Sequence, residues 1–361
     1  MIKKYDQPAD LSAYQAISEA QKIAFSAIGF QAVVCLLRLG ILERVSKAGE
    51  DGVNSRDLAE ALSISEYGVK VLLDMGLTMS VVWMNDDCYV LDKVGHFLLE
   101  DRMTQVNMNF AQDVCYEAMN HLKASIENNK PEGLKIFGNW PTIYPGLSLL
   151  PSPAKESWFE FDHFYSGAAF PEALSHVFET KPSHIFDVGG NTGVWANHCV
   201  EYDPDVRVTI VDLPEQTALA RDNVQRNSAH PARIDTSDID VLDPQQGLPS
   251  GADTIWMSQF LGCFSEVQIF EILKKAIAVM NEESSLFILE TFWDRQQDHA
   301  GAYSLNATSL YFTCIANGTS RMYHSKDIID VAQKSGLSVA AQHDGLGIGH
   351  TLLHCRKAPS G

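Results

Sequence analysis

Apolar residues recur every three or four positions through the first part of the chain, between Leu11 and Val45. That spacing is typical of amphipathic helices, and it predicts two helices that meet near Gly29 and Phe30. So much apolar surface on terminal helices fits either ordinary core or a subunit interface, because large exposed apolar faces are rare on monomers. The sequence is compatible with both interpretations.

A helix-turn-helix and a hairpin are predicted next. Residues 54–77 contain two short helical patterns, each preceded by serine or asparagine residues suited to capping. Residues 79–90 have the pattern of a β-hairpin, with its turn at 85–87. Helices followed by a hairpin predict a winged-helix domain, which we place at residues 1–105.

Residues 106–180 alternate helical patterns with Pro and Gly breaks and are rich in Trp and Phe. We interpret this stretch as a helical connecting region. Aromatic clusters usually belong to a core, but one that precedes a nucleotide-binding fold can also line an aromatic substrate pocket. The candidate substrate-binding residues in such a pocket are Phe161 and Tyr165.

From His184 onward, short apolar strands alternate with helix-length segments. This order predicts an α/β domain, residues 181–361, with a parallel sheet covered by helices on both faces. Residues 328–335 read as a further helix, and closing strands follow at 338–343 and 350–356. The strands predicted before them are residues 184–188, 206–212, 254–257 and 286–290.

The amino-acid composition limits the number of domains and the class of protein. The 361 residues suffice for two or three domains, and 45% apolar with 20% charged residues is typical of a folded protein. Seven cysteines without a CxxC pair read as reduced thiols, since an odd number leaves one unpaired in an oxidising compartment. The N-terminus lacks the apolar run of a signal peptide, and no apolar stretch of about 18 residues appears. These features predict a cytoplasmic protein without a membrane span.

The charge balance argues against nucleic acid as a partner. The chain has 27 basic and 46 acidic residues, and its formal charge of −19 repels phosphate backbones and anionic lipid surfaces. The second helix of the predicted helix-turn-helix contains Glu66, Asp74 and a single lysine, Lys70. Phosphate contact needs more positive charge than that. A structural or dimerisation role is therefore favoured over DNA binding, and no membrane partner is expected.

The most informative motif is residues 185–193, Ile-Phe-Asp-Val-Gly-Gly-Asn-Thr-Gly. A strand that leads into a glycine turn lets the backbone approach a nucleotide-like ligand closely. The spacing is not that of a dinucleotide fingerprint, and the lysine of a phosphate loop is missing, so NAD, flavin, ATP and GTP are disfavoured. Asp212 follows Gly189 by 23 positions at a strand end, where a carboxylate suits ribose hydroxyls. Asp240 lies where the next strand would end and could meet an adenine amino group.

Together with Val-Asp-Leu-Pro at 211–214 and Ala-Asp-Thr-Ile-Trp-Met-Ser-Gln at 252–259, these motifs resemble the catalytic domain of class I S-adenosylmethionine-dependent methyltransferases. Over nearly its full length, the chain resembles the small-molecule O-methyltransferases related to plant caffeate and bacterial hydroxyneurosporene enzymes. The resemblance implies a Rossmann-like domain, S-adenosyl-L-methionine as cofactor, and a homodimer formed through the N-terminal domain. It implies cofactor contacts by Asp187, Gly189, Gly190, Gly193, Asp212, Leu213, Asp240, Val241, Ser258 and Gln259.

One motif departs from the family pattern. Members usually carry a Leu-His-Asp-Trp segment after the fourth strand, and its histidine deprotonates the acceptor hydroxyl. Here residues 260–266 read Phe-Leu-Gly-Cys-Phe-Ser-Glu, so Gly262 stands in place of that histidine. A carboxylate that often supports the histidine survives as Glu290, whereas Ser320 replaces a second one. The usual general base is therefore absent.

Two histidines are candidate substitutes. His324 and His350 lie in segments that close the pocket in the family, and a neutral imidazole can take a proton near pH 7. With Glu290 they form the candidate catalytic set, although either histidine also fits a surface or core role. Cys263 reads as a packed thiol. The acids near 235–243 lack the spacing of metal ligands, and no metal is expected.

The predicted function is methyl transfer from S-adenosylmethionine to a small, aromatic acceptor, with O-methylation favoured. Alignment of nucleophile and methyl group in a dry cleft supplies much of the catalysis, so loss of the base does not forbid the reaction. Methylation of carbon on a phenol ring and a cofactor-binding homologue without catalysis are the alternatives. A DNA-binding regulator is the least favoured interpretation.

Overall fold

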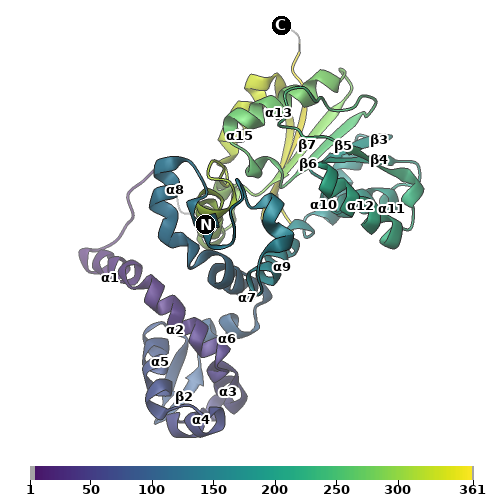
Figure 1. The fold of residues 1–361 in the computed structure, drawn as a ribbon. Coiled ribbons are helices and arrows are strands. Elements are labelled where there is room, and N and C mark those ends of the chain that lie inside the picture. The colour runs from purple at the N-terminus through teal and green to yellow at the C-terminus, as the bar shows by residue number, and fades with distance from the viewer. Residues whose placement is uncertain (1–4, 360–361) are drawn as a thin grey trace. The chain divides into compact units, whose positions relative to one another are not determined.

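The computed structural model describes residues 5–359, whose contacts divide the chain into two compact units (Figure 1). The N-terminal unit contains the described residues up to Tyr116 together with Glu156–Phe161. The C-terminal unit contains Glu117–Lys155 and the residues from Asp162 onward. The expected connecting region, residues 106–180, is shared between the two units, and the three-part division stays a prediction.

One helix, α9 (Ala154–Ser166), contributes to both units. Inside the N-terminal unit, the Phe161 ring stacks on Phe110 with centroids 4.0 Å apart. The Ser157 hydroxyl donates a hydrogen bond of 2.7 Å to Asp113. These contacts join residues more than 40 positions apart, which sequence periodicity does not reveal.

Three helices open the N-terminal unit: α1 (Ala13–Ala24), α2 (Ser26–Arg38) and α3 (Ile41–Ala48). The first two are separated at Phe25 and bent by 63°, so the predicted junction near Gly29 is wrong. Gly29 lies buried inside α2, and a Cβ there would come within 3.3 Å of the Met75 side chain. The glycine permits close packing and does not end the helix.

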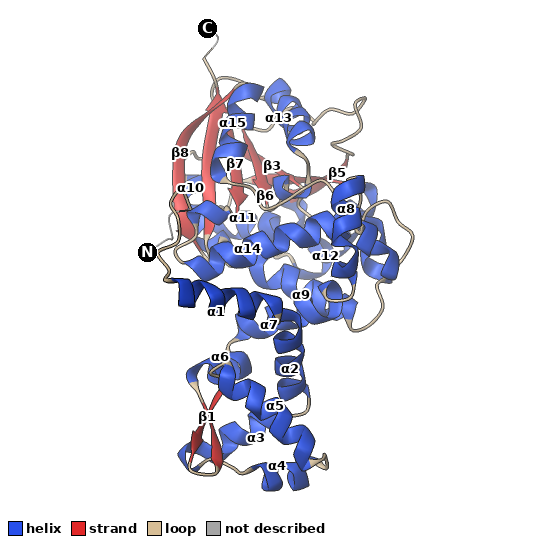
Figure 2. Ribbon diagram, turned by 90° about the vertical axis from the view of Figure 1, so that its left-hand side faces the viewer, coloured by secondary structure: helices blue, strands red, loops and turns tan. Residues whose placement is uncertain are grey.

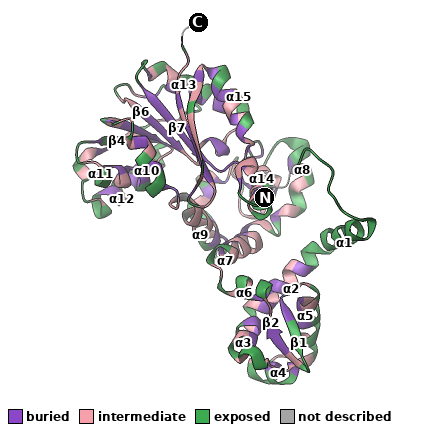
Figure 3. Cartoon of the chain, turned by 180° about the vertical axis from the view of Figure 1, so that it is seen from behind, coloured by how far each residue is buried: buried purple, intermediate pink, exposed green. Residues whose placement is uncertain are grey.

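Helix α1 carries exposed apolar side chains (Figure 3). None of its residues is buried, and Tyr14 and Ile23 are 83% and 75% exposed. Across residues 5–359 no single helix is long and apolar enough to cross a membrane, although α1 and α2 together meet the length and composition requirement as a bent pair.

The predicted helix-turn-helix and hairpin are present. Their elements are α4 (Ser55–Leu62), α5 (Glu66–Thr78), β1 (Val82–Asn85) and β2 (Cys88–Leu91). Asn54 and Ser65 cap the two helices by accepting hydrogen bonds from the peptide N–H groups of Asp57 and Gly68. The two strands are antiparallel, and their turn places Asp86 at φ 50°, which aspartate tolerates.

The chain between the hairpin and the large sheet is mainly helical. Its helices, besides α9, are α6 (Lys93–Glu100), α7 (Arg102–Phe110), α8 (Leu122–Asn128) and α10 (Phe170–Phe178). A π-helical turn, Ala111–Cys115, continues α7, and 3₁₀ turns cover Glu132–Ile136 and Tyr144–Leu149.

The C-terminal unit is built on one sheet (Figure 2). Its strands are β3 (His184–Val188), β4 (Arg207–Asp212), β5 (Ile234–Asp238), β6 (Thr254–Ser258), β7 (Ser285–Glu290), β8 (Leu337–Leu346) and β9 (His350–Lys357). They lie in the order β5-β4-β3-β6-β7-β9-β8. The first five in this order are parallel, and β9 pairs antiparallel with both β7 and β8. The predicted parallel sheet and its two closing strands are confirmed.

Strand β5 is not among the strands predicted from apolar runs, and the sequence indicates it only through the strand end expected at Asp240. It lies at the edge of the sheet, and only Ile234 among its residues is buried. The other positions are polar, as an edge strand in contact with water allows. Such a pattern lacks the apolar run that identifies the inner strands.

Helices cover both faces of this sheet. They are α10 together with α11 (Val194–Tyr202), α12 (Pro214–Asn227), α13 (Glu266–Val279) and α15 (Ser325–Ser335), while α14 (His299–Tyr311) contacts the turns Trp293–Arg295 and Phe312–Ala316. On one face, Trp195 of α11 stacks on Trp256 of β6 with centroids 3.8 Å apart. On the other, α13 and α15 pack Ile269 and Ile328 into a second apolar core. The sheet is thus held between two cores.

Candidate active site

Four parallel strands end at the same edge of the sheet. Strands β3, β4, β6 and β7 finish at Val188, Asp212, Ser258 and Glu290. In open α/β sheets, ligands bind in the crevice outside the carboxyl ends of the strands. The structure therefore brings the glycine turn, Asp212, Ser258 and Glu290 to the edge where a ligand is expected.

The glycine turn follows β3 directly. Gly189 has φ 75°, a conformation that side chains rarely adopt, and a Cβ there would collide with the Phe260 ring. A Cβ on Gly190 would lie 2.6 Å from the Asp187 carboxylate. Gly193 ends the turn at φ 78° and begins α11. The tight turn needs glycine at these positions for steric reasons alone.

Asp212 ties this turn to the end of β4. Its Oδ2 accepts a hydrogen bond of 3.0 Å from the Asn191 peptide N–H, and its Oδ1 accepts one of 2.8 Å from Leu213. Burial raises the pKa of Asp212, and these two bonds oppose the shift. A carboxylate has about four lone-pair sites, so two more donors, such as ribose hydroxyls, can still be accepted.

Two polar groups near the turn have no hydrogen-bond partner within the described residues. One is Oδ2 of Asp187, and the other is Nε2 of Gln259. Burial, with a smaller contribution from Asp212, raises the pKa of Asp187 to about 8. Gln259 has φ 47°, and its peptide N–H donates to Leu289. Unpartnered buried polar groups are costly unless a ligand completes them, so these residues fit a polar, cationic cofactor group.

The segment after β5 forms a tight polar turn. Asp240 Oδ1 accepts a hydrogen bond from the Leu242 peptide N–H at 2.9 Å, and the Asp240 N–H donates to Gln246. Val241 is buried, and its carbonyl accepts a hydrogen bond from Lys275. The role of Asp240 and Val241 beside an adenine stays a prediction.

Glu290 lies beside Gly262, the position where the resemblance leads us to expect histidine. The Gly262 peptide N–H donates a hydrogen bond of 3.2 Å to Oε1 of Glu290. Burial raises the pKa of Glu290 to about 7, although the peptide N–H groups of residues 260–262 oppose the shift. A carboxylic acid that titrates near neutral pH is suited to proton transfer.

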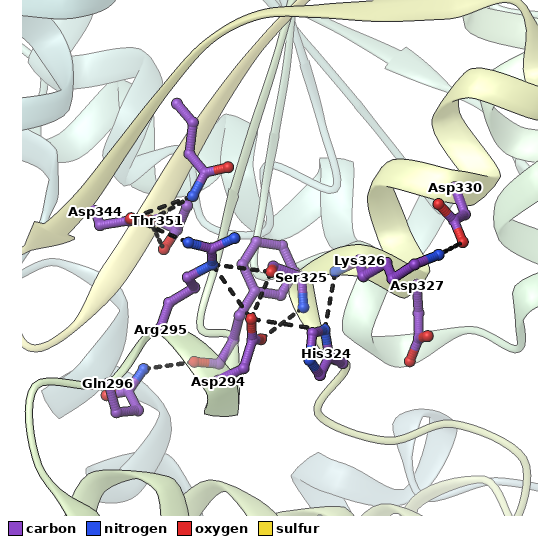
Figure 4. Close-up of polar contacts among 12 residues, drawn as sticks. Asp294, Arg295, Gln296, His324, Ser325, Lys326, Asp327, Asp330, Asp344 and Thr351 are labelled. Atoms are coloured by element: carbon purple, nitrogen blue, oxygen red, sulfur yellow. Dashed lines mark hydrogen bonds and ion pairs between the residues drawn. The ribbon is translucent and has the colours of Figure 1, made fainter. Parts of the chain in front are cut away.

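The two candidate histidines lie in different surroundings. His350 is fully buried at the start of β9, and burial lowers its pKa to about 4. His324 precedes α15 and caps it, with Nδ1 accepting a hydrogen bond of 3.0 Å from the Lys326 peptide N–H (Figure 4). The same nitrogen lies 3.6 Å from Asp294. A catalytic role for either histidine stays a prediction, and both have environments that restrict it.

A polar cluster near Gly262 was not predicted from the sequence. Nδ2 of Asn317 lies 3.1 Å from the Tyr144 hydroxyl, 3.0 Å from the Cys263 carbonyl and 2.7 Å from the Ser320 hydroxyl. Burial raises the pKa of Tyr144, and it raises the pKa of Cys263 to about 12. Tyr144 and Asn317 lie outside the recognised motifs, so no pattern in one sequence identifies them. The raised pKa of Cys263 is consistent with the packed thiol predicted from the sequence.

The predicted substrate-binding aromatic residues belong to different units. Phe161 packs on Phe110 in the N-terminal unit, and Tyr165 makes an edge contact with Phe164 in the C-terminal unit. Contact of either with an acceptor stays a prediction.

Residues 5–359 contain no metal-binding cluster and no disulfide bond. No three histidine, cysteine or carboxylate side chains there are placed to hold a metal ion. The seven cysteines of the chain are all free thiols, and three of them are buried.

Comparison with known families identifies both units. Residues 172–338 match the model of the O-methyltransferase domain, and residues 18–89 match that of the Dimerisation2-like domain. A 3-hydroxy-5-methyl-1-naphthoate 3-O-methyltransferase of Streptomyces sahachiroi is 23% identical over 311 residues, covering 85% of this chain and 86% of that protein. The O-methyltransferase pgmB of Aspergillus terreus is 25% identical over 308 residues, covering 78% and 68% respectively.

Solved structures show the same fold. The apo form of the S-adenosylmethionine-dependent methyltransferase SibL has a TM-score of 0.73 at 19% identity, covering 95% of this chain and 99% of its own. The O-methyltransferase NcsB1 from neocarzinostatin biosynthesis, in complex with S-adenosylmethionine and 2-hydroxy-5-methyl naphthoic acid, has a TM-score of 0.66 at 16% identity, covering 97% and 100%.

Fold, glycine turn and strand-end acids together define an S-adenosylmethionine-dependent methyltransferase. Within that class, residues 172–338 match the O-methyltransferase domain, and a match to a dimerisation-type domain precedes them. The family resemblance and the α/β fold predicted from the sequence are confirmed.

Proposed function

We propose that this chain transfers the methyl group of S-adenosylmethionine to a hydroxyl oxygen on a small aromatic acceptor. The proposal is carried by one observation: the glycine turn, Asp212 and the unpartnered groups of Asp187 and Gln259 share one strand-end edge. The acceptor class is supported by the relatives, since one is named for a naphthoate hydroxyl and the NcsB1 structures contain naphthoic acids.

Each part of the cofactor has candidate contacts in this proposal. S-adenosylmethionine, when bound, supplies an electrophilic methyl group on a positively charged sulfur. Asp212 accepts the ribose hydroxyls through the lone pairs left by its backbone bonds. The unpartnered polar groups of Asp187 and Gln259 form hydrogen bonds with the amino-acid end of the cofactor. The remaining contacts are assigned to Gly189, Gly190, Gly193, Leu213, Asp240, Val241 and Ser258.

The experiment combines binding with product analysis. Calorimetry should detect binding of S-adenosylmethionine and S-adenosylhomocysteine and none of NAD or ATP. With 3-hydroxy-1-naphthoate as the first probe of a hydroxynaphthoate panel, mass spectrometry should show a gain of one methyl group, and NMR should place it on oxygen. A ring-methylated product would favour carbon methylation. Binding without turnover across the panel would favour a non-catalytic homologue.

We also propose that the chain is a homodimer joined through its N-terminal helices. The dimerisation-type match at residues 18–89 and the exposed side chains of Ile17, Ile23 and Ile28 support this assignment. An obligate interface of this kind buries more than about 2,000 Å². Sedimentation at micromolar concentration should give a dimer, and Ile23→Asp should weaken it, whereas Glu19→Gln on the same helix should not. A folded wild-type monomer would contradict the proposal.

Regulation by DNA binding through a winged helix remains the competing function. Helix α5, the second helix of the helix-turn-helix, gives this function little support. Its single lysine, Lys70, pairs with Glu66 at 2.8 Å, and the helix also carries Asp74. We expect no binding to duplex DNA at low salt, measured by fluorescence anisotropy. A location in the cytoplasm stays a prediction from the sequence.

A further inference from the structure

The carboxyl group of Glu290 is fixed at the edge of the sheet where the parallel strands end. Glu290 is the last residue of β7, and its side chain is buried. The 3₁₀ turn Leu261–Cys263 presents the Gly262 peptide N–H to Oε1 at 3.2 Å. This bond holds Oε1, the N–H groups of Leu261 and Phe260 also act on the carboxyl group, and Oε2 is the oxygen nearest to the Cβ position of Gly262.

Gly262 leaves space directly in front of that second oxygen. A Cβ built on Gly262 would have only Oε2 of Glu290 within 4 Å among the described residues, at 3.5 Å. Gly262 is not among the glycines with positive φ, so the backbone itself would accept a side chain here. The missing side chain therefore opens a gap beside a carboxyl oxygen, and the turn does not need glycine for its conformation.

The gap lies close to the cofactor end of the site. The turn begins at Phe260, whose ring packs on Gly189, and Gln259 bonds to Leu289, the neighbour of Glu290. The Cys263 thiol in the same turn is close enough to Glu290 and Asp212 for both charges to raise its pKa further. A group that enters the gap therefore contacts Glu290 beside the turn whose Phe260 ring packs on Gly189.

We propose that Glu290 is the catalytic base: Oε2 takes the hydroxyl proton of the acceptor through the gap at Gly262. This inference rests on the proposed O-methyltransferase function. The acceptor O–H bond breaks as the Glu290 O–H bond forms. The electron pair left on the acceptor oxygen forms the bond to the methyl carbon, whose bond to sulfur breaks with its electrons remaining on sulfur. Glu290 then releases its proton to solvent.

Other titratable groups in contact with this region are poorly suited to the step. The charges of Cys263 and Tyr323 interact with Glu290, but burial raises the pKa of both groups far above neutral pH, so they stay protonated. Burial lowers the pKa of His350 to about 4, which makes it a weak proton acceptor. His324 uses Nδ1 to cap α15. The pKa of about 7 for Glu290 matches a base that works near neutral pH.

The activity test compares Glu290→Gln, which keeps an acceptor for the Gly262 N–H, with Glu266→Gln, an exposed carboxylate near the same turn. General-base catalysis contributes about 10²–10⁴-fold. With 3-hydroxy-1-naphthoate, kcat of Glu290→Gln should fall at least about 100-fold and lose its acid limb near pH 7, whereas Glu266→Gln keeps both. A 4-nitro derivative, whose hydroxyl is more acidic, should recover most of the rate.

Further variants test the gap and the folding of the protein. Gly262→Ala keeps the carboxyl group but fills the space in front of Oε2, and it should lower kcat at least about tenfold while leaving cofactor affinity within about twofold. Glu290→Asp should keep an acid limb at reduced kcat. Calorimetric affinity of Glu290→Gln for S-adenosylhomocysteine should match wild type, which also shows that the variant is folded.

A measurement without cofactor or acceptor completes the test. Infrared difference spectra of the free protein should contain a protonated-carboxyl band that titrates near pH 7 and is missing in Glu290→Gln, while the band of Asp187 persists. If wild type turns over the probe but Glu290→Gln matches it in rate and pH profile, or His350→Gln alone removes the acid limb, the base assignment is overturned and the O-methyltransferase function stands. If wild type methylates no acceptor oxygen, both fail.

Discussion

The cofactor end and the proton-transfer end of the site are built in different ways. At the cofactor end, Asp212 holds Asn191 and Leu213, within a span of 22 positions along the chain. At the proton-transfer end, Gly262 meets Glu290 across 28 positions, and Asn317 reaches Cys263 across 54. The Asp212 bonds tie the glycine turn to the end of the neighbouring strand β4, whereas Gly262 and Asn317 contact segments that lie farther apart along the chain. The proposed cofactor residues therefore lie in recognisable motifs, whereas the proposed proton-transfer site also contains residues outside any motif.

Burial of an acidic side chain serves a different purpose at each of the two ends of the site. Asp187 and Glu290 are both buried acids whose pKa is raised, to about 8 and about 7. A positively charged cofactor lowers the cost of ionising Asp187, because an opposite charge favours the charged form. Glu290 needs the reverse property, a carboxyl group that ionises with difficulty and so accepts a proton readily. The two ends should respond differently to pH and to substitution.

The largest effect expected concerns stability at the proton-transfer end. The pKa of Glu290 is about 7 when folded, against 4.5 for a free glutamate, so the folded state binds more protons between those values and stability falls as pH rises. Above pH 7, the free energy of unfolding of Glu290→Gln, measured by denaturant titration, should therefore exceed that of wild type by up to about 3 kcal/mol. Below pH 4.5 the two free energies should match.

Glu266→Gln is the control for that experiment, because Glu266 is exposed. A Glu290→Gln variant that gains no stability at pH 8 relative to pH 4 would mean that Glu290 ionises normally, and the contrast between the two ends would disappear.

The next effect concerns the cofactor end. Asp212→Ala removes the acceptor for two backbone N–H groups and for the proposed ribose hydroxyls. Charge-assisted hydrogen bonds contribute about 1.5–3 kcal/mol each, so affinity for S-adenosylmethionine should fall at least about tenfold. Calorimetry measures it, with Asp235→Asn on the edge strand as control. Unchanged affinity would remove Asp212 from the cofactor end.

A smaller effect tests whether His324 belongs to the proton-transfer end or to the framework. Loss of a helix cap costs about 1 kcal/mol, so His324→Ala should lower the unfolding free energy by that amount. His324→Asn, which keeps a capping acceptor, should recover most of it in the same urea titration. Equal stability of the two variants would show that capping is not the function of this side chain.

The smallest effect is a fraction of a proton released on cofactor binding. Near pH 7.5, Asp187 is largely protonated because its pKa is about 8, and a cationic ligand lowers that pKa. Binding enthalpies measured in buffers of different ionisation enthalpy should report proton release, and Asp187→Asn should abolish most of it. Proton uptake by wild type would contradict the charge assignment at the cofactor end.

Much of the fold could be predicted because the inner strands are apolar and glycine turns punctuate them. Strand β7 is buried along its whole length and was predicted from its apolar run, whereas the polar edge strand β5 was not. The bend at Phe25 was not predicted. A glycine that is needed for close packing, such as Gly29, cannot be distinguished in the sequence from a glycine that ends a helix.

The candidate site could be predicted where its residues lie in motifs. Asp187, Gly189 and Asp212 follow from one strand-turn-helix pattern. Tyr144 and Asn317 could not be found, since neither has a local signal and only tertiary packing places them beside Cys263. The sequence shows that Gly262 lacks a side chain, but only the structure shows that Glu290 faces the vacant position.

The place of β9 in the sheet has a consequence for how the chain folds during synthesis. Strand β9 lies between β7 and β8, yet it begins 60 positions after β7 ends. Until the ribosome has delivered those residues, β7 presents an open, strongly apolar edge that invites pairing with another chain. Nascent chains stalled before His350 should therefore bind chaperones longer than chains stalled after Lys357.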